Sequence, residues 1–183
     1  MSDTQLATNA MTGLGSGRYF GKYRGTVVEN VDPMMIGRVL AIVPDVSNTI
    51  PTSWAMPCVP WAGLQTGMFH VPAIGAGVWI EFEQGDPDYP IWTGCYWGSP
   101  AEVPAAALLS PPPLSAVTFQ TSLQNSLSIS DLPGPTGGIL IKSMSGASIA
   151  VNEIGITIQN GQGASIVMTG PSVTINEGAL MVV

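Results

Sequence analysis

The C-terminal third of the chain contains an internal repeat with a fixed period. Residues 147–161 read ASIAVNEIGITIQNG and residues 164–178 read ASIVMTGPSVTINEG, with one constant offset that carries Ala147 onto Ala164 and Gly161 onto Gly178. The same offset extends back to residues 139–141, and a degenerate copy, NSLSISD, occupies residues 125–131. Because a short constant period is typical of stacked structural units, this segment is predicted to form successive rungs.

Each period holds two runs in which Ile and Val alternate with Ser, Thr, Asn and Gln, the pattern of strands with one apolar face. One alternative is a solenoid made by a single chain, but the period is short for a three-sided rung. We expect instead that three chains wind about one axis and bury the apolar face there. The residues expected at this axis are Ile139, Ile141, Ile149, Val151, Ile156, Ile158, Ile166, Met168, Val173 and Ile175.

The composition also indicates surfaces buried between chains. Apolar residues make up 45% of the 183 residues and charged residues only 9%, which is too few to cover a compact monomer in the usual way. The net charge is -7, with five Lys and Arg, and this argues against nucleic acid as a partner. Cys58 and Cys95 are interpreted as small buried apolar residues, with a disulfide between them as the alternative.

Residues 71–98 are predicted to form a long hairpin. Apolar residues at positions 78, 80 and 82 alternate with Trp79, Glu81 and Glu83, as in a strand with one buried face. The corner GDPDYP at residues 85–90 ends this strand, because glycine permits a positive φ and proline donates no hydrogen bond. A second strand is expected over residues 91–97.

Further strands are expected at residues 19–31, 38–43 and 54–63, without a helical pattern of convincing length. Five short strands favour a small barrel of the oligonucleotide/oligosaccharide-binding (OB) type. The fold class is therefore predicted as all-β, a five-stranded OB barrel followed by an intertwined trimeric β-helix. The expected divisions are an extended arm at 1–18, the barrel at 19–98, a linker rich in Pro and Ala at 99–114, and the β-helix at 115–183.

The order of these motifs resembles the central spike proteins of contractile injection systems, the family of the phage baseplate assembly protein V and of the VgrG spikes of type VI secretion. The resemblance rests on the DPMMIGRV turn, the WA and WAG segments, the GDPDYPIWTG corner and the repeat, and it spans residues 19–183. The barrel positions that carry it are Asp32, Pro33, Gly37, Arg38, Trp54, Trp61, Gly75, Phe82, Gly85, Asp86, Pro87, Pro90 and Gly94.

This resemblance implies a homotrimeric needle without enzymatic activity, in a phage tail baseplate or a secreted injection particle. Such a needle joins a hub to a tip and passes transiently through the target envelope. No hub domain precedes the barrel, so a separate hub protein is expected, and no signal peptide is recognised, which implies synthesis in the cytoplasm. A small tip protein of the PAAR-repeat kind is expected to dock on Leu180, Met181, Val182 and Val183, with the alternative that these residues fold back as a plug.

No catalytic, metal or cofactor site is predicted. The sole histidine, His70, is interpreted as a hydrogen-bonded loop residue rather than a base or ligand. Glu81 and Glu83 are interpreted as solvent-facing positions rather than a glycosidase pair, and the two Asp of GDPDYP as turn residues rather than metal ligands.

Two other functions remain as alternatives. The first is a tail-spike β-helix that binds or degrades carbohydrate, which requires an exposed aromatic groove or a carboxylate pair. Only Glu153 and Glu177 are available for such a pair in the β-helix. The second is a barrel that binds single-stranded nucleic acid, which the acidic net charge disfavours.

Overall fold

The computed structural model describes residues 17–110 and 112–182. The chain divides into two compact units, with the boundary between Gly98 and Ser99. In the described part of both units the elements are almost all strands: the α-helix α2 (Pro44–Ser47) has four residues, and the 3-10 helices have three each. The prediction of an all-β fold is confirmed.

The first unit is built on a five-stranded sheet with the order β2-β1-β6-β7-β3. Its strands are β1 (Tyr23–Glu29), β2 (Leu40–Ile42), β3 (Met56–Pro57), β6 (Gly77–Phe82) and β7 (Pro90–Tyr96). Next to the two edge strands, Val39 and Ala55 exchange backbone hydrogen bonds of 3.2 and 2.8 Å. This bridge joins one edge of the sheet to the other, and the curled sheet fits the predicted OB barrel.

The core of this unit lies inside the curled sheet. Alternate residues of β6 are buried, as the sequence pattern predicts, and Trp92 of β7 is fully buried among them. The Trp92 indole Nε1 donates a hydrogen bond of 3.0 Å to the carbonyl oxygen of Gly37, so this polar group is satisfied inside the core. The buried apolar residues are Val27, Val39, Ala41, Val43, Ala55, Val78, Ile80, Phe82 and Trp92.

The corner between β6 and β7 has the predicted turn chemistry. Gly85 ends the 3-10 helix η1 (Glu83–Gly85) with a φ of 79°, and a β-carbon there would lie 3.0 Å from atoms of Arg18 and Phe20. The Asp86 side chain accepts a hydrogen bond of 3.0 Å from the backbone N–H of Asp88. The chain therefore turns sharply before β7 begins.

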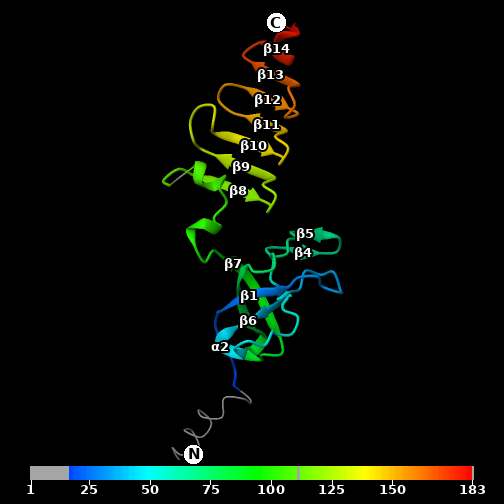
Figure 1. Cartoon of the computed structure of the whole chain (residues 1–183), viewed down its shortest axis with the longest axis vertical. Coiled ribbons are helices and arrows are strands. Elements are labelled where there is room, and N and C mark those ends of the chain that lie inside the picture. The colour runs from blue at the N-terminus through cyan, green and yellow to red at the C-terminus, as the bar shows by residue number, and fades with distance from the viewer. Residues whose placement is uncertain (1–16, 111, 183) are drawn as a thin grey trace, which may run out of the picture. The chain divides into compact units, whose positions relative to one another are not determined.

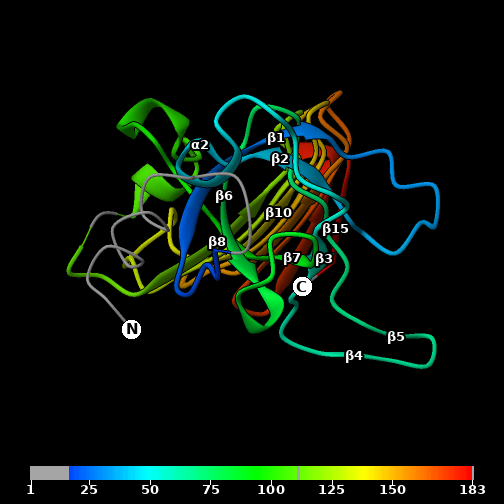
Figure 2. The same cartoon turned by 90° about the horizontal axis from the view of Figure 1, so that it is seen from below.

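Residues 54–63 do not form the single strand that was expected. Only Met56 and Pro57 join the main sheet, because Pro57 and Pro60 have no N–H to offer a ladder. A separate hairpin follows, β4 (Ala62–Gly63) with β5 (Thr66–Gly67). In two views this hairpin and the loop between β1 and β2 extend from the same side of the barrel (Figures 1 and 2).

The second unit begins with the 3-10 helices η2 (Pro100–Glu102) and η3 (Ala107–Leu109), in place of a continuous polyproline run. Eight strands follow, and each pairs antiparallel with the next, so that the sheet order follows the chain. They are β8 (Ala116–Gln120), β9 (Ser126–Ser130), β10 (Gly138–Lys142), β11 (Ser148–Val151), β12 (Ile156–Gln159), β13 (Ser165–Thr169), β14 (Ser172–Ile175) and β15 (Leu180–Val182), with the 3-10 helix η4 (Asn176–Gly178) before the last. Figure 1 shows them as successive rungs.

The repeat corresponds to these rungs, since β11 and β12 form one copy and β13 and β14 the next. The sequence analysis did not anticipate β8. Unlike the barrel, this unit has no interior: none of the residues whose burial is described between 99 and 180 is buried. A single chain therefore buries too little apolar surface to stabilise this unit, which requires contact with a further surface.

Candidate functional site

The apolar residues of the second unit lie on one face of its sheet. Ile139 pairs with Val151, and Ile141 pairs with Ile149. Directly paired residues point to the same side of a sheet, and Ile149 pairs onward with Ile158. The same register continues through every strand pair.

Two columns of apolar side chains result, and we call them together the apolar sheet face. One column contains Val117, Ile129, Ile139, Val151, Ile156, Met168 and Val173. The other contains Phe119, Leu127, Ile141, Ile149, Ile158, Ile166, Ile175 and Leu180. All ten residues expected at the trimer axis lie in these columns.

Five further members of the apolar sheet face were not expected at the axis. Leu180 was expected at the tip instead, and the sequence analysis missed Val117, Phe119, Leu127 and Ile129. They lie on β8 and β9, ahead of the regular repeat, where the fixed period is lost. The signal that identifies them is local: AVTFQ and SLSIS each alternate apolar and polar residues.

The apolar sheet face is open to solvent in the single chain. The exposed fraction is 54% at Phe119 and still 38% at Ile166. The positions between the two columns point to the opposite side, and most of them are small or polar, such as Thr118, Ser128 and Thr157. A continuous apolar face of this length requires a cover.

Asparagine side chains hold the turns between the rungs. Asn125 accepts a hydrogen bond of 3.0 Å from the backbone N–H of Met144. Asn160 accepts two, from the N–H groups of Gln162 and Ala164, at 2.8 and 3.0 Å. These bonds link each turn to its own rung or to a neighbouring one, which fixes the stack locally.

In the barrel, the central element of the motif is an ion pair within the loop between β1 and β2. The Asp32 carboxylate accepts backbone hydrogen bonds from Met34, Ile36 and Arg38, and two more from the Arg38 guanidinium, the shorter at 2.6 Å. Its side chain is only 3% exposed. These bonds, with Arg38 first, hold the pKa of Asp32 well below its usual value. Arg38 in turn stacks on Trp54, 5.4 Å from the ring centroid.

The other barrel motif residues have structural positions, either in the same loop as this ion pair or elsewhere in the barrel. Gly37, Gly75 and Gly94 all have positive φ, and Pro90 is fully buried at the start of β7. Trp61 is 57% exposed near the β4–β5 hairpin. The remaining motif residues, Phe82, Gly85, Asp86 and Pro87, belong to β6 or to the corner after it, and Pro33 is exposed beside Asp32.

The interpretation of the two cysteines as buried residues is wrong. Cys58 and Cys95 are both exposed and unpaired. Cys95 lies on β7 beyond the two residues that β3 covers, Ile91 and Trp92, and Cys58 comes directly after β3. Partial burial still raises the pKa of the Cys95 thiol.

Other candidate residues take structural positions. Glu81 forms an ion pair of 2.8 Å with Lys22 on the barrel surface, and Glu83 lies in η1. His70 packs edge-on against Trp92, with 5.3 Å between the ring centroids. Over residues 17–110 and 112–182, no group of three or more His, Cys, Asp or Glu is placed to hold a metal ion. Nor does any helix in that part have the length and apolar character to span a membrane.

The expected tip surface is only partly described. Leu180 pairs with Ile175 at the last strand in the sheet order and is 55% exposed. Met181 and Val182 continue β15 in the backbone. Val183 lies outside the described residues.

Comparison with known families gives two matches. Residues 23–97 match the type VI secretion system/phage-baseplate injector OB domain. Residues 116–181 match the phage baseplate V C-terminal trimerisation domain. The chain therefore carries an injector OB domain followed by a baseplate V trimerisation domain, which is consistent with a VgrG-like baseplate spike. The two matches confirm the resemblance in the sequence, and the trimerisation domain supports a homotrimer.

Curated relatives agree with this assignment over short segments. The spike protein VgrG1a of Pseudomonas aeruginosa is 39% identical over 70 residues, which are 36% of this chain and 11% of that protein. In Vibrio cholerae, the actin cross-linking toxin VgrG1 is 45% identical over 47 residues, 26% of this chain and 4% of the toxin. The spike protein VgrG3 is 42% identical over 48 residues, 26% of this chain and 5% of the relative. The matched segments thus span about a tenth or less of these relatives.

Proposed function

We propose that three copies of this chain form the structural central spike of a contractile tail or injection-machine baseplate, joining a trimeric hub to a tip that penetrates the target envelope. The observation that carries the proposal is the apolar sheet face, whose two unbroken columns span seven and eight strands without a buried residue among those described. The match to the trimerisation domain supports three copies as the cover of this face, and the similarity to spike proteins supports the structural role.

The proposed stiffness has two sources. Each rung is joined to the next by backbone hydrogen bonds along the whole sheet. Three apolar sheet faces packed together exclude water from the axis, and shortening or bending that axis would expose apolar area again. A mechanical element needs these properties and needs no catalytic group.

The two ends of this spike take different partners in the proposal. The barrel faces a separate baseplate hub protein, and residues 99–114 act as the linker between the barrel and the β-helix. A small PAAR-like tip protein docks at β15, where Leu180 is exposed. The assembled chain belongs to a phage tail or an injection particle, and it acts without enzymatic activity of its own.

Sedimentation of the purified chain tests the assembly. A mass near three times 19.0 kDa is expected, and a monomer at micromolar concentration would refute the spike. Deleting residues 180–183 and repeating a pull-down with candidate tip proteins tests the tip, because undiminished capture would remove that partner. Contracting particles mixed with target cells test penetration: the chain is expected inside the target envelope after contraction, and its retention outside speaks against piercing.

A further inference from the structure

A second apolar surface lies on the barrel and has no role in the proposed β-helix. The loop between β1 and β2 exposes Met34 by 61% and Met35 by 83%. Met35 has a positive φ of 54°, which is uncommon for a residue with a side chain. A loop that holds methionines out in water in a sparsely populated conformation is typical of a contact surface.

This loop is rigid rather than adaptable. The buried Asp32 carboxylate binds three backbone N–H groups of the loop and the Arg38 guanidinium. These bonds fix the backbone on both sides of Met35. A loop fixed in this way loses little conformational entropy when a partner binds, which favours binding.

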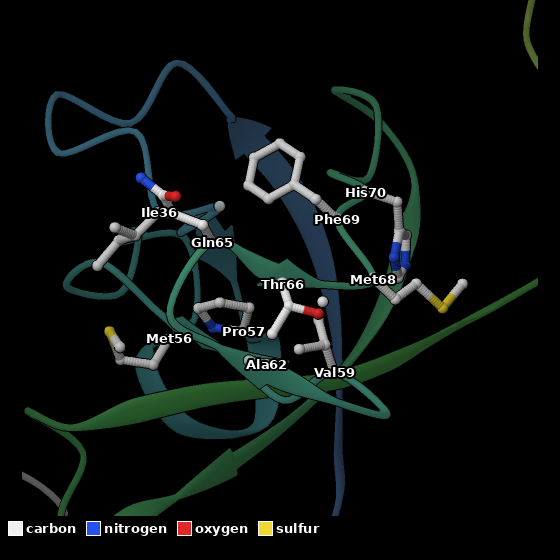
Figure 3. Close-up of a pocket in the computed structure, with 12 residues that line it drawn as sticks. Ile36, Met56, Pro57, Val59, Ala62, Gln65, Thr66, Met68, Phe69 and His70 are labelled. Atoms are coloured by element: carbon white, nitrogen blue, oxygen red, sulfur yellow. The ribbon is translucent and has the colours of Figure 1, made fainter.

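Beside the loop, the same barrel has an apolar pocket of about 510 Å³. Its lining includes Ile36, Met56, Val59 and Phe69, and it contains no Asp, Glu, Lys or Arg. Figure 3 shows Ile36 and Met56 on one side and Met68 and His70 on the other, with Pro57, Val59 and Thr66 between them. His70 rests on the buried Trp92, so this side of the pocket is anchored to the core.

The loop does not fill the pocket of its own barrel. Ile36 and Gly37 line the pocket, whereas Met34 and Met35 do not. The Asp32 bonds hold the loop backbone in a conformation in which both methionines are exposed. The barrel therefore carries a protruding apolar surface and a receiving apolar surface that are adjacent but separate.

We propose that Met34 and Met35 of one copy insert into this pocket on the next copy, so that the three barrels form a closed ring of their own. The occupant is a second copy because the trimerisation domain brings three copies together. Tethering turns a weak contact between barrels into one at high effective concentration. A protrusion that meets a different surface on its neighbour is a heterologous contact, and three such contacts close into a ring under threefold symmetry.

This inference rests on the three-copy assembly and adds a second interface to it. The test uses the full chain with the photo-crosslinking residue benzoylphenylalanine at position 35, co-expressed with an unmodified chain that carries a different affinity tag. Mixed trimers are isolated through both tags, and their mass is measured before irradiation. The expected product joins chains with different tags, with the attachment mapped by mass spectrometry to residues 56–70.

Two controls make the result specific. Benzoylphenylalanine at Tyr89, which is 62% exposed at the β6–β7 corner and outside the pocket lining, should give only background cross-linking between chains. Val59→Glu in the unmodified chain places a charge in the pocket and should lower the yield from position 35 about tenfold.

The outcomes separate the two proposals. A monomeric mass overturns both the spike and the ring. Intact trimers that cross-link only within one chain, or not at all, overturn the ring and leave the spike standing. Cross-linking to a co-purified hub protein in place of residues 56–70 also overturns the ring and assigns the methionines to that partner.

Discussion

Gly138 lies against the backbone carbonyl of Val151 so closely that a β-carbon on Gly138 would overlap the carbonyl oxygen. Gly155 has the same relation to Met168, with both partners displaced by the repeat period. Gly138 also has a φ of 80°. The repeat therefore preserves a backbone contact as well as a pattern of side chains, and only glycine fits there.

Gly138→Ala is expected to destabilise the β-helix strongly, because both the overlap and the positive φ oppose an alanine. Gly170→Ala is the matched control: Gly170 has a φ of 55° but no atom within 4 Å of an added β-carbon. The control should cost only about 1–2 kcal/mol, from its φ alone. Thermal unfolding followed by circular dichroism measures the stability of both variants. Equal losses of stability would contradict the close approach at Gly138.

Ile158→Asp is expected to prevent trimer formation. Full burial of the isoleucine side chain contributes about 1.5–3 kcal/mol per copy to the stability of the trimer, and the substitution removes this contribution. It also brings three carboxylates together, one from the apolar sheet face of each copy. The neighbouring Thr157→Asp changes the opposite side of β12 and should leave the trimer intact. Sedimentation measures both, and loss of the trimer in Thr157→Asp alone would show that the other side of the sheet is covered.

Asp32→Asn is expected to lower the stability of the barrel near neutral pH and to reduce its sensitivity to acid. The folded-state pKa of Asp32 is depressed, so its stabilisation is fully present above its usual value near 3.8 and is lost as the pH falls below it toward the folded-state value. Tryptophan fluorescence in urea reports the barrel selectively, because all five Trp lie between residues 54 and 97.

This prediction is tested by comparing how the urea midpoints of the native chain and of Asp32→Asn depend on pH. Between pH 5 and pH 2, the urea midpoint should fall more steeply for the native chain than for Asp32→Asn. Parallel curves would mean that Asp32 contributes nothing through its charge.

Gly77→Ala is expected to destabilise the barrel through its effect on Tyr96. A β-carbon at position 77 would lie 2.8 Å from the Tyr96 ring. This ring lies 5.2 Å from the Arg24 guanidinium and packs at a tilt against Trp79, with 5.0 Å between the ring centroids. Overpacking of this kind costs about 1–3 kcal/mol. In a double-mutant cycle, Tyr96→Ala should relieve part of the cost, and strictly additive effects would contradict the overlap.

Much of the fold was predictable because its signals are local. The alternation of Val78, Ile80 and Phe82, the GDPDYP corner and the fixed period of the repeat each indicate an element without knowledge of the rest of the chain. The hairpin β4–β5 was not predicted because strands of two residues have no periodicity. The strand β8 was not predicted because it lies outside the regular repeat. The exposure of Cys58 and Cys95 was not predicted because it depends on the length of β3, and the sequence alone does not show how short this strand is.

The ten residues of the apolar sheet face within the repeat were predictable, since a fixed register follows from a fixed period, whereas the four on β8 and β9 lie outside that period. The pocket beside the β1–β2 loop was not predictable, because Ile36, Met56 and Phe69 come from three separate segments. Asp32 and Arg38 were identified as motif residues, but the network of five hydrogen bonds around Asp32 emerges only from the folded loop.

Because none of the second unit's residues with described burial is buried, we expect folding and association to be a single event for this half of the molecule. In a newly synthesised chain the barrel can fold on its own core, whereas the apolar sheet face of the second unit is buried from water only when two further copies bind. The yield of functional needles should therefore rise steeply with the local supply of nascent chains, and polysomes that release several copies together would favour the correct partners over aggregation.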